Sequence, residues 1–101
     1  MDPLVITILH SLSKEEAVRR LRPALGRTVQ MFPVLKLEHE QWTDERMDFR
    51  LAAFGQFVTG NMLIGDKDVR IEVTLPWLLA KFPDAVQEAI ILRTRVLLDK
   101  K

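Results

Sequence analysis

The sequence predicts an α+β domain in which two helical segments cover one face of an antiparallel sheet. Residues 69–75 alternate apolar and polar side chains, which is the period-two pattern of a strand with one buried face. Residues 34–75 contain four strand-like segments joined by short links, and this favours an antiparallel meander. Apolar residues at helical spacing follow the first strand-like segment and recur near the C-terminus, so the helices flank the meander.

The first strand and the first helix are predicted from residue type and capping. Leu4–His10 is rich in β-branched residues, which favours a strand. Ser13 and Glu16 have the spacing of a capping box, in which the hydroxyl accepts from the amide of Glu16 and its carboxylate reaches back. Apolar residues at three-and-four spacing then predict one helix that ends before Pro33. Pro23 lies inside this helix and removes a backbone hydrogen bond, so we expect a kink in the preceding turn.

Four further strands are predicted between the helices. Their apolar residues alternate with polar ones, and turn-forming residues separate them. Pro76 ends the last strand because it has no N–H to donate. The predicted strands are residues 34–42, 47–53, 57–64 and 69–75, with links at residues 43–46, around Gly55 and at residues 65–68.

The last helix is predicted to begin at Pro83 and Asp84, with Asp84 as its cap. Apolar side chains are so frequent in it that they form a face wider than a single sheet needs. We expect this face to contain Val86, Ala89, Ile90, Arg93, Val96 and Leu97, widened by Ile91, Leu92 and Leu98.

The predicted element order is β-α-β-β-β-β-α, which gives a two-layer α+β domain with an antiparallel sheet. The chain has 101 residues and no repeat or linker, so residues 1–101 are expected to form a single α+β domain. TATA-binding-protein-like domains and reduced relatives of the helix-grip fold share this order. That analogy concerns shape and carries no function.

Charge and cysteine content narrow the classes of function. Fifteen Lys and Arg against fourteen Asp and Glu leave a net charge of +1, so the chain lacks the basic excess of nucleic-acid binders. The absence of cysteine excludes disulfides and thiol nucleophiles and suits a reducing cytoplasm. No uncharged run reaches the roughly 18 residues of a membrane span, and Met-Asp-Pro does not resemble a signal peptide. We expect a cytoplasmic protein without a nucleic-acid partner or a membrane span.

Residues with reactive side chains do not form a recognisable catalytic or metal motif. His10 and His39 have no partner at metal-ligand spacing, so structural or surface roles are expected for both. The carboxylates of Asp44-Glu45 and of residues 66–68 lie in predicted turns, where Asp favours the backbone geometry. The sequence therefore predicts no catalytic residue, no cofactor and no metal. An enzyme that uses the turn carboxylates is the weakest alternative.

Two groups of residues are candidates for binding. Phe54 and Phe57 lie opposite the expected core-facing residues of their segments, and an apolar cluster follows Pro76, so some of these side chains are expected to face outward. The interface candidates are Phe54, Phe57, Trp77, Leu78 and Leu79. A basic stripe on the first helix is usually a solvated face, although it could contact a weak anionic partner. The candidates for that anionic surface are Arg19, Arg20 and Arg27.

The sheet leaves two further possibilities open. Its edges and its uncovered face need protection, which favours a homodimer. A curved sheet that grips a helix can also enclose an apolar pocket, so a small apolar-ligand carrier is the alternative function.

The order of elements and three segments resemble the polyhydroxyalkanoic acid system proteins over about residues 4–98. The segments are His10-Ser-Leu12 before a capped helix, the strand that contains Gly60, and above all Val69–Leu79 with its Leu75-Pro-Trp-Leu-Leu79. The family consists of small bacterial proteins whose genes lie among those for making and using polyhydroxyalkanoate storage granules, and it offers no catalytic residues to transfer. The resemblance implies a non-enzymatic accessory protein that acts through a protein partner or the granule surface, in the cytoplasm or at storage granules.

Overall fold

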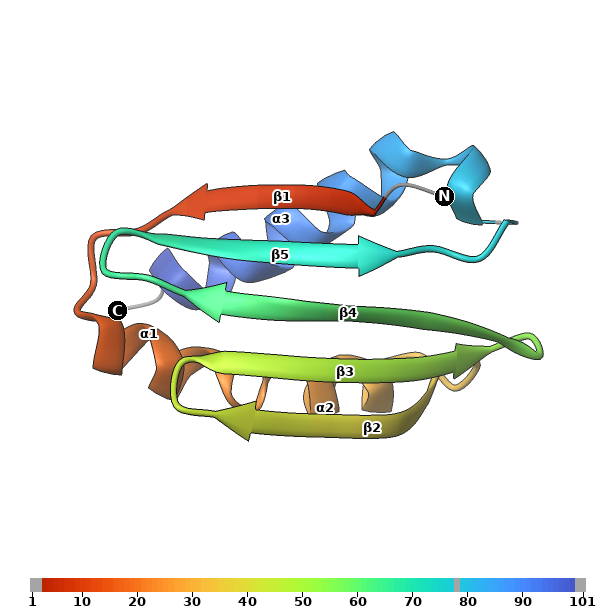
Figure 1. Cartoon of the computed structure of the whole chain (residues 1–101), viewed down its shortest axis with the longest axis horizontal. Helices are drawn as coiled ribbons and strands as arrows, with labels where there is room; N and C mark the ends of the chain where they lie inside the picture. The colour runs from red at the N-terminus through yellow and green to blue at the C-terminus, as the bar shows by residue number, and fades with distance from the viewer. Residues whose placement is uncertain (1–2, 78, 100–101) are drawn as a thin grey trace.

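The computed structural model describes residues 3–77 and 79–99, which form one antiparallel sheet covered on one face by helices (Figure 1). The strand order is β1-β5-β4-β3-β2, so β1 and β2 are the edges. The elements are β1 (Leu4–Leu9), α1 (Lys14–Leu21), α2 (Ala24–Met31), β2 (Lys36–Thr43), β3 (Arg46–Ala53), β4 (Gln56–Ile64), β5 (Asp68–Thr74), the 3-10 helix η1 (Leu79–Lys81) and α3 (Pro83–Asp99). The predicted α+β class is confirmed, while the two named fold analogies stay predictions.

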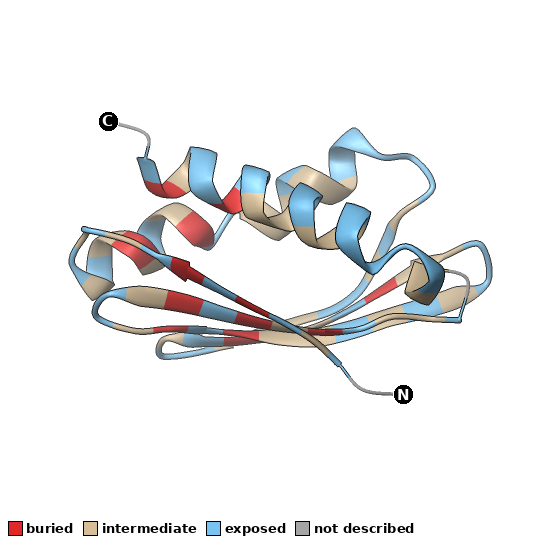
Figure 2. Cartoon of the chain, turned by 90° about the horizontal axis from the view of Figure 1, so that it is seen from above, coloured by how far each residue is buried: buried red, intermediate tan, exposed pale blue. Residues whose placement is uncertain are grey.

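The core forms where alternating strand residues meet the helices. Val69, Ile71 and Val73 of β5 are buried, as their period-two spacing predicts. The register places Ile6 and Ile8 of β1 beside them on the same face. Ala17, Leu21 and Leu98 cover this face from α1 and α3. Figure 2 shows that the buried positions lie mainly toward the C-terminal half of α3.

Pro23 divides the predicted first helix into two helices, so the expectation of a single kinked helix is wrong. The Arg22 N–H donates to the carbonyl of Val18 at 2.9 Å and closes α1. Pro23 has no N–H for the carbonyl of Arg19, and α2 begins after it. The Pro23 carbonyl then accepts the first hydrogen bond of α2, from the amide of Arg27. α2 packs against β2 and lies behind β2 and β3 in the view of Figure 1.

The start and the buried face of α3 also differ from the prediction. The carbonyl of Phe82 accepts from the Val86 N–H at 3.2 Å, so Asp84 lies inside the first turn and is not the cap. The buried residues of α3 are Thr94 and Leu98, and Ile90, Ile91 and Leu97 pack beside them. The exposed ones include Ala89, Arg93 and Val96, which were expected to be buried. Because apolar residues surround this helix, spacing alone does not fix which side meets the sheet.

Gly60 keeps β4 close to both neighbouring strands. A Cβ atom at this position would lie 2.1 Å from the carbonyl oxygen of Glu72 and 2.9 Å from the ring of Phe49. Phe49 is also the cross-strand partner of Gly60, so its ring occupies the space that a side chain would need. Only glycine fits here without moving the backbone of β5.

Candidate apolar contact surface

The strands run along the long axis of the molecule, which measures 37 × 23 × 23 Å, so the connecting segments gather at two ends (Figure 1). One end holds the β3–β4 turn, the segment after α2 and the segment from β5 to α3. The end with the β3–β4 turn is called the aromatic end, because it carries the exposed side chains of Phe32, Phe54, Phe57, Trp77 and Phe82. The opposite end holds the β2–β3 and β4–β5 turns and the link from β1 to α1, and it is called the polar end.

The aromatic end collects most aromatic residues of the chain. The sequence contains five Phe and two Trp, and only Trp42 and Phe49 among them pack against the core. Met31 and Val34 are exposed in or beside the segment after α2 and extend the same surface. Aromatic side chains normally supply core contacts, so this concentration on one end makes it a candidate contact surface.

Phe54 lies at the tip of the β3–β4 hairpin with a left-handed backbone. Its φ angle is 54° and that of Gly55 is 74°, and the two residues close the turn between paired Ala53 and Gln56. Such turns favour Asn, Asp or Gly, and a bulky residue with positive φ is unusual. The Phe54 side chain is 77% exposed, so no packing compensates for this conformation. Backbone strain at an exposed ring is typical of a functional position.

Cations lie over three rings of the aromatic end. The guanidinium carbon of Arg50 is 3.8 Å from the ring centre of Phe57, and the Lys81 ammonium is 5.1 Å from that of Trp77. Arg93 of α3 reaches Phe32 at 5.3 Å. Each cation shields part of its ring and stabilises its position by cation–π attraction. The surface thus combines apolar rings with positive charges.

The structure exposes some of the predicted interface residues and partly buries another. Phe54, Phe57 and Trp77 are exposed at the aromatic end. Leu79 is half-buried in η1, and Leu78 lies outside the described residues. Sequence reasoning missed Phe32 and Phe82 as surface residues. A signal was present, because each precedes a proline at a helix boundary, where the chain leaves regular structure.

Ionic and polar contacts hold the polar end together. The Lys14 ammonium lies 3.6 Å from a carboxylate oxygen of Glu45 and 3.7 Å from one of Asp66, so it joins the two turns. His10 accepts from the Leu12 N–H through Nδ1 at 3.1 Å. Its Nε2 then carries the proton and donates to the carbonyl of Gly65 at 3.0 Å. These contacts give His10 the structural role predicted for it.

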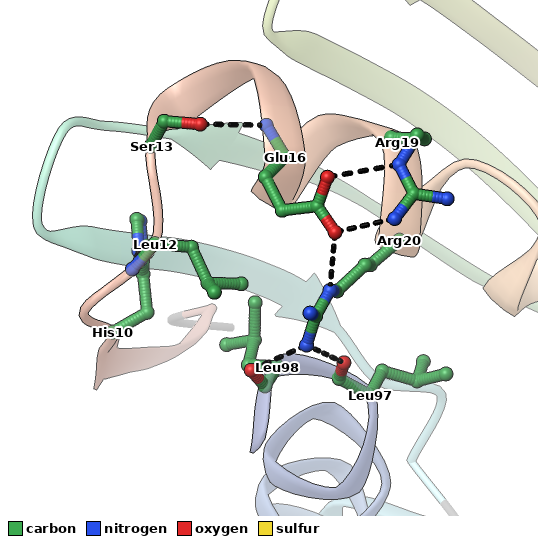
Figure 3. A network of polar contacts seen from close by, with 8 residues as sticks. All are labelled: His10, Leu12, Ser13, Glu16, Arg19, Arg20, Leu97 and Leu98. Atoms are coloured by element: carbon green, nitrogen blue, oxygen red, sulfur yellow. Dashed lines mark hydrogen bonds and ion pairs between the residues drawn. The ribbon is translucent and has the colours of Figure 1, made fainter. Parts of the chain in front are cut away.

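Arg19 and Arg20 share the carboxylate of Glu16 (Figure 3). The Arg20 guanidinium also donates to the carbonyls of Leu98 at 3.0 Å and Leu97 at 3.4 Å, which ties α1 to the C-terminal end of α3. Hydrogen bonds from Arg19 and Arg20 lower the pKa of Glu16 to about 2. The Ser13 hydroxyl accepts from the Glu16 amide at 3.1 Å as predicted, but the Glu16 carboxylate does not reach back to Ser13.

The anionic-surface prediction for Arg19, Arg20 and Arg27 therefore concerns side chains in different settings. Arg20 is partly buried in its contacts with Glu16 and α3, whereas Arg19 is exposed on α1. Arg27 is exposed on the separate helix α2. The structure does not present them as one continuous stripe on one helix, and their contact with an anionic partner stays a prediction.

The uncovered face of the sheet carries polar pairs. Arg46 contacts Asp48 at 3.1 Å, and Glu72 accepts from Asn61 at 3.3 Å and from Arg70 at 3.2 Å. These residues project from three neighbouring strands on the side away from the helices. This face is therefore not a continuous apolar patch, and the apolar surface lies elsewhere.

Within residues 3–77 and 79–99, no three His, Asp or Glu side chains gather in a way that could hold a metal ion. A shallow surface opening between β1 and α3 is lined by Leu9, His10, Ser11, Lys67, Arg95 and Asp99, which are mostly polar. None of the helices in the described part of the chain is both long and apolar enough to cross a bilayer.

Comparison with known proteins identifies the family. A family model described as "Putative polyhydroxyalkanoic acid system protein" matches residues 4–98, which is nearly the whole chain. No curated protein and no solved structure matches the chain. The chain belongs to the polyhydroxyalkanoic acid system protein family.

Proposed function

We propose that this protein is a non-enzymatic accessory protein of the polyhydroxyalkanoate storage system that attaches to the granule surface by its aromatic end. One observation carries the proposal: five of seven aromatic side chains are exposed at one end of an elongated molecule. Family membership supplies the setting. The proposed location is the cytoplasm, at or near storage granules, which agrees with the lack of cysteine.

The physical basis is transfer of exposed rings from water to a polyester surface. Full burial of a large apolar side chain contributes about 1.5–3 kcal/mol, so partial burial of several rings would give on the order of 5 kcal/mol. Polyester carbonyls accept hydrogen bonds, and Arg50, Lys81 and Arg93 place donors beside the rings. Rings flanked by polar groups are typical of side chains at an apolar–water boundary.

A particle-binding assay with matched variants tests the proposal. Phe57 and Leu63 both project from the outer face of β4 and are 45% and 42% exposed, but Phe57 lies at the aromatic end and Leu63 near the polar end. We expect Phe54→Asn with Phe57→Thr to weaken binding to polyhydroxyalkanoate particles about tenfold or more, which is about 1.4 kcal/mol or more. Leu63→Thr should leave binding unchanged.

Two results would contradict the proposal. One is binding of the native protein no stronger than that of albumin. The other is an equal loss in the Leu63 variant, since this would indicate general adhesion and not the aromatic end. Circular dichroism and thermal unfolding of each variant separate a binding defect from misfolding.

The alternative function is a small apolar-ligand carrier. The surface opening at His10 is lined mainly by polar and charged side chains, unlike the largely apolar sites that hold such ligands. A protein partner at the aromatic end is compatible with the same rings. Pull-down from a host that lacks granules would distinguish it from direct attachment.

A further inference from the structure

The side of α3 that faces away from the sheet carries a second apolar stripe. Ala85, Ala89, Leu92 and Val96 are all exposed, and Leu92 and Val96 are 65% and 66% exposed. They lie roughly half a turn round the helix from buried Thr94. We call these four residues the outer seam.

The spacing of the outer seam is that of a helix-pairing interface. Its residues are separated by four, three and four positions, which is the a/d pattern of paired helices. An isolated exposed leucine needs no explanation, but four apolar residues in this register form a continuous line. The seam is therefore suited to a second helix of similar length.

The sizes of the seam residues favour an antiparallel copy of α3 as the second helix. The small residues Ala85 and Ala89 lie toward the N-terminus and the larger Leu92 and Val96 toward the C-terminus. An antiparallel copy would place Ala89 against Leu92 and Ala85 against Val96, so that each layer pairs one small with one large side chain. A parallel copy would pair alanine with alanine and leave those layers under-filled.

Charge complementarity favours the same arrangement. Glu88 and Arg95 flank the seam on one side, and a two-fold antiparallel pairing brings each near the other residue of the second copy. Arg95 is exposed and uses one N–H for the carbonyl of Leu9 at 2.7 Å, which leaves other donors. On the opposite flank, Arg93 is directed toward Met31 and Phe32 of its own chain.

We infer that two copies of this chain pair through the outer seams of antiparallel α3 helices. The seam extends over only about 16 Å of helix, from 1.5 Å per residue, so the interface is smaller than that of a stable dimer. Association is therefore weak and concentration-dependent. The two-fold axis of this pairing places the two aromatic ends on opposite sides of the dimer. If the proposed granule contact also holds, one dimer can bridge two particles.

The first test is sedimentation of the full chain over a range from micromolar to about millimolar concentration. We expect the average mass of the native protein to rise toward twice the monomer. Leu92→Glu should reduce association at least tenfold. Glu88→Arg should reduce it several-fold, and Glu88→Arg with Arg95→Glu should regain part of the loss. The exposed Leu63→Glu variant serves as control and should associate like the native protein.

The second test separates antiparallel from parallel pairing. Because the chain has no cysteine, single thiols can be introduced at chosen positions. With oxidised glutathione as electron acceptor, a mixture of Ala89→Cys and Leu92→Cys proteins should cross-link faster than either protein alone. Faster cross-linking of Leu92→Cys alone would overturn the antiparallel pairing.

Two results bear on the inference independently of the granule contact. A native protein that stays monomeric throughout, or a dimer that Leu92→Glu does not weaken, would overturn it; the second result would favour pairing at the sheet edges β1 or β2. Particle clustering that is lost in Leu92→Glu while single-particle binding persists would support the bridging consequence. Failure of particle binding alone would contradict only the proposed function.

Discussion

Each end of this molecule has a two-residue hairpin turn that begins with a left-handed residue, but the residue type at that position differs. Asp44 in the β2–β3 turn and Phe54 in the β3–β4 turn both have a φ angle of 54°. Asp tolerates this left-handed conformation, whereas Phe rarely adopts it. At the polar end, the turn residues have a role in folding, because they form the salt bridges of Lys14 and the hydrogen bonds of His10. At the aromatic end, folding alone does not explain the exposed rings.

The distribution of the core follows the same division. Ile8, Ile64 and Val69 are buried and lie at the strand ends next to the links of the polar end. Figure 2 shows that most buried positions gather toward this end. α2 contains no buried residue and covers β2 and β3 with half-buried side chains. Stability therefore comes mainly from one end, while the other presents its side chains to solvent. This separation predicts that changes at the two ends affect different measurements.

The largest effect is expected midway between the ends, at Gly60→Ala. The added methyl group would lie 2.1 Å from the backbone oxygen of Glu72, and that oxygen moves only if β5 moves. We expect a loss of about 3 kcal/mol in the free energy of unfolding, measured by urea denaturation. Gly26→Ala is the control, because no atom lies within 4 Å of the Cβ position there. A Gly60 variant as stable as the native protein would contradict this close approach of β4 and β5.

A smaller effect is expected at the polar end, for His10→Ala. The substitution removes the hydrogen bonds from the Leu12 amide and to the Gly65 carbonyl, and two such bonds contribute about 1–3 kcal/mol. Thermal unfolding should show this loss, and binding to polyhydroxyalkanoate particles should not change once the variant is folded. Loss of particle binding by the folded variant would show that the two ends do not act separately.

Exchanging the turn residues sharpens the comparison between the ends. Phe54→Asp should raise the free energy of unfolding by about 1 kcal/mol, because Asp adopts the left-handed conformation more readily. The same variant should bind particles less well. Asp44→Phe is the reciprocal variant and should lower stability by a similar amount. A Phe54→Asp protein that is less stable than the native chain would remove the argument that strain is retained there for binding.

Much of this fold could be predicted from single residue patterns. The alternation of residues 69–75 and of Met47, Phe49 and Leu51 indicates correctly which side chains face the helices. The orientation of α3 could not be predicted, because Leu92 and Val96 fit an apolar face as well as Ile90 and Leu98 do. Helix periodicity identifies a buried side only when the other side is polar.

The contact surface was only partly predictable for a different reason. Phe54 and Phe57 can be predicted as surface residues because they lie opposite the core-facing residues of their own segments. Phe32 and Phe82 lie far from them in sequence and reach the same end only through the topology of the sheet. Local patterns carry no information about which loops meet, so a surface built from three loops emerges only with the fold.

The smallest expected effect is the pH dependence of the contact between α1 and α3. Hydrogen bonds from Arg19 and Arg20 lower the pKa of Glu16 from 4.5 to about 2. A lowered carboxyl pKa means that the native state favours the ionised form, so this contribution is complete above about pH 5. It is lost as the pH falls toward 2, when Glu16 is protonated and releases the guanidinium groups. Because Arg20 also binds the last carbonyls of α3, the loss should loosen the junction of α1 with α3.

Glu16→Gln should therefore show a shallower fall in the unfolding temperature between pH 5 and pH 2 than the native protein. The effect should be small because Arg19 is exposed and Glu16 is only half-buried, so solvent screens their interaction. Glu15→Gln is a matched control, since it changes the same charge one residue earlier on the exposed side of α1. Equal slopes for both variants would show that the pairing of Glu16 with the two arginines does not contribute. If the slope changes only for Glu16→Gln and particle binding does not change, the Glu16 contacts contribute to the stability of the polar end and not to binding at the aromatic end.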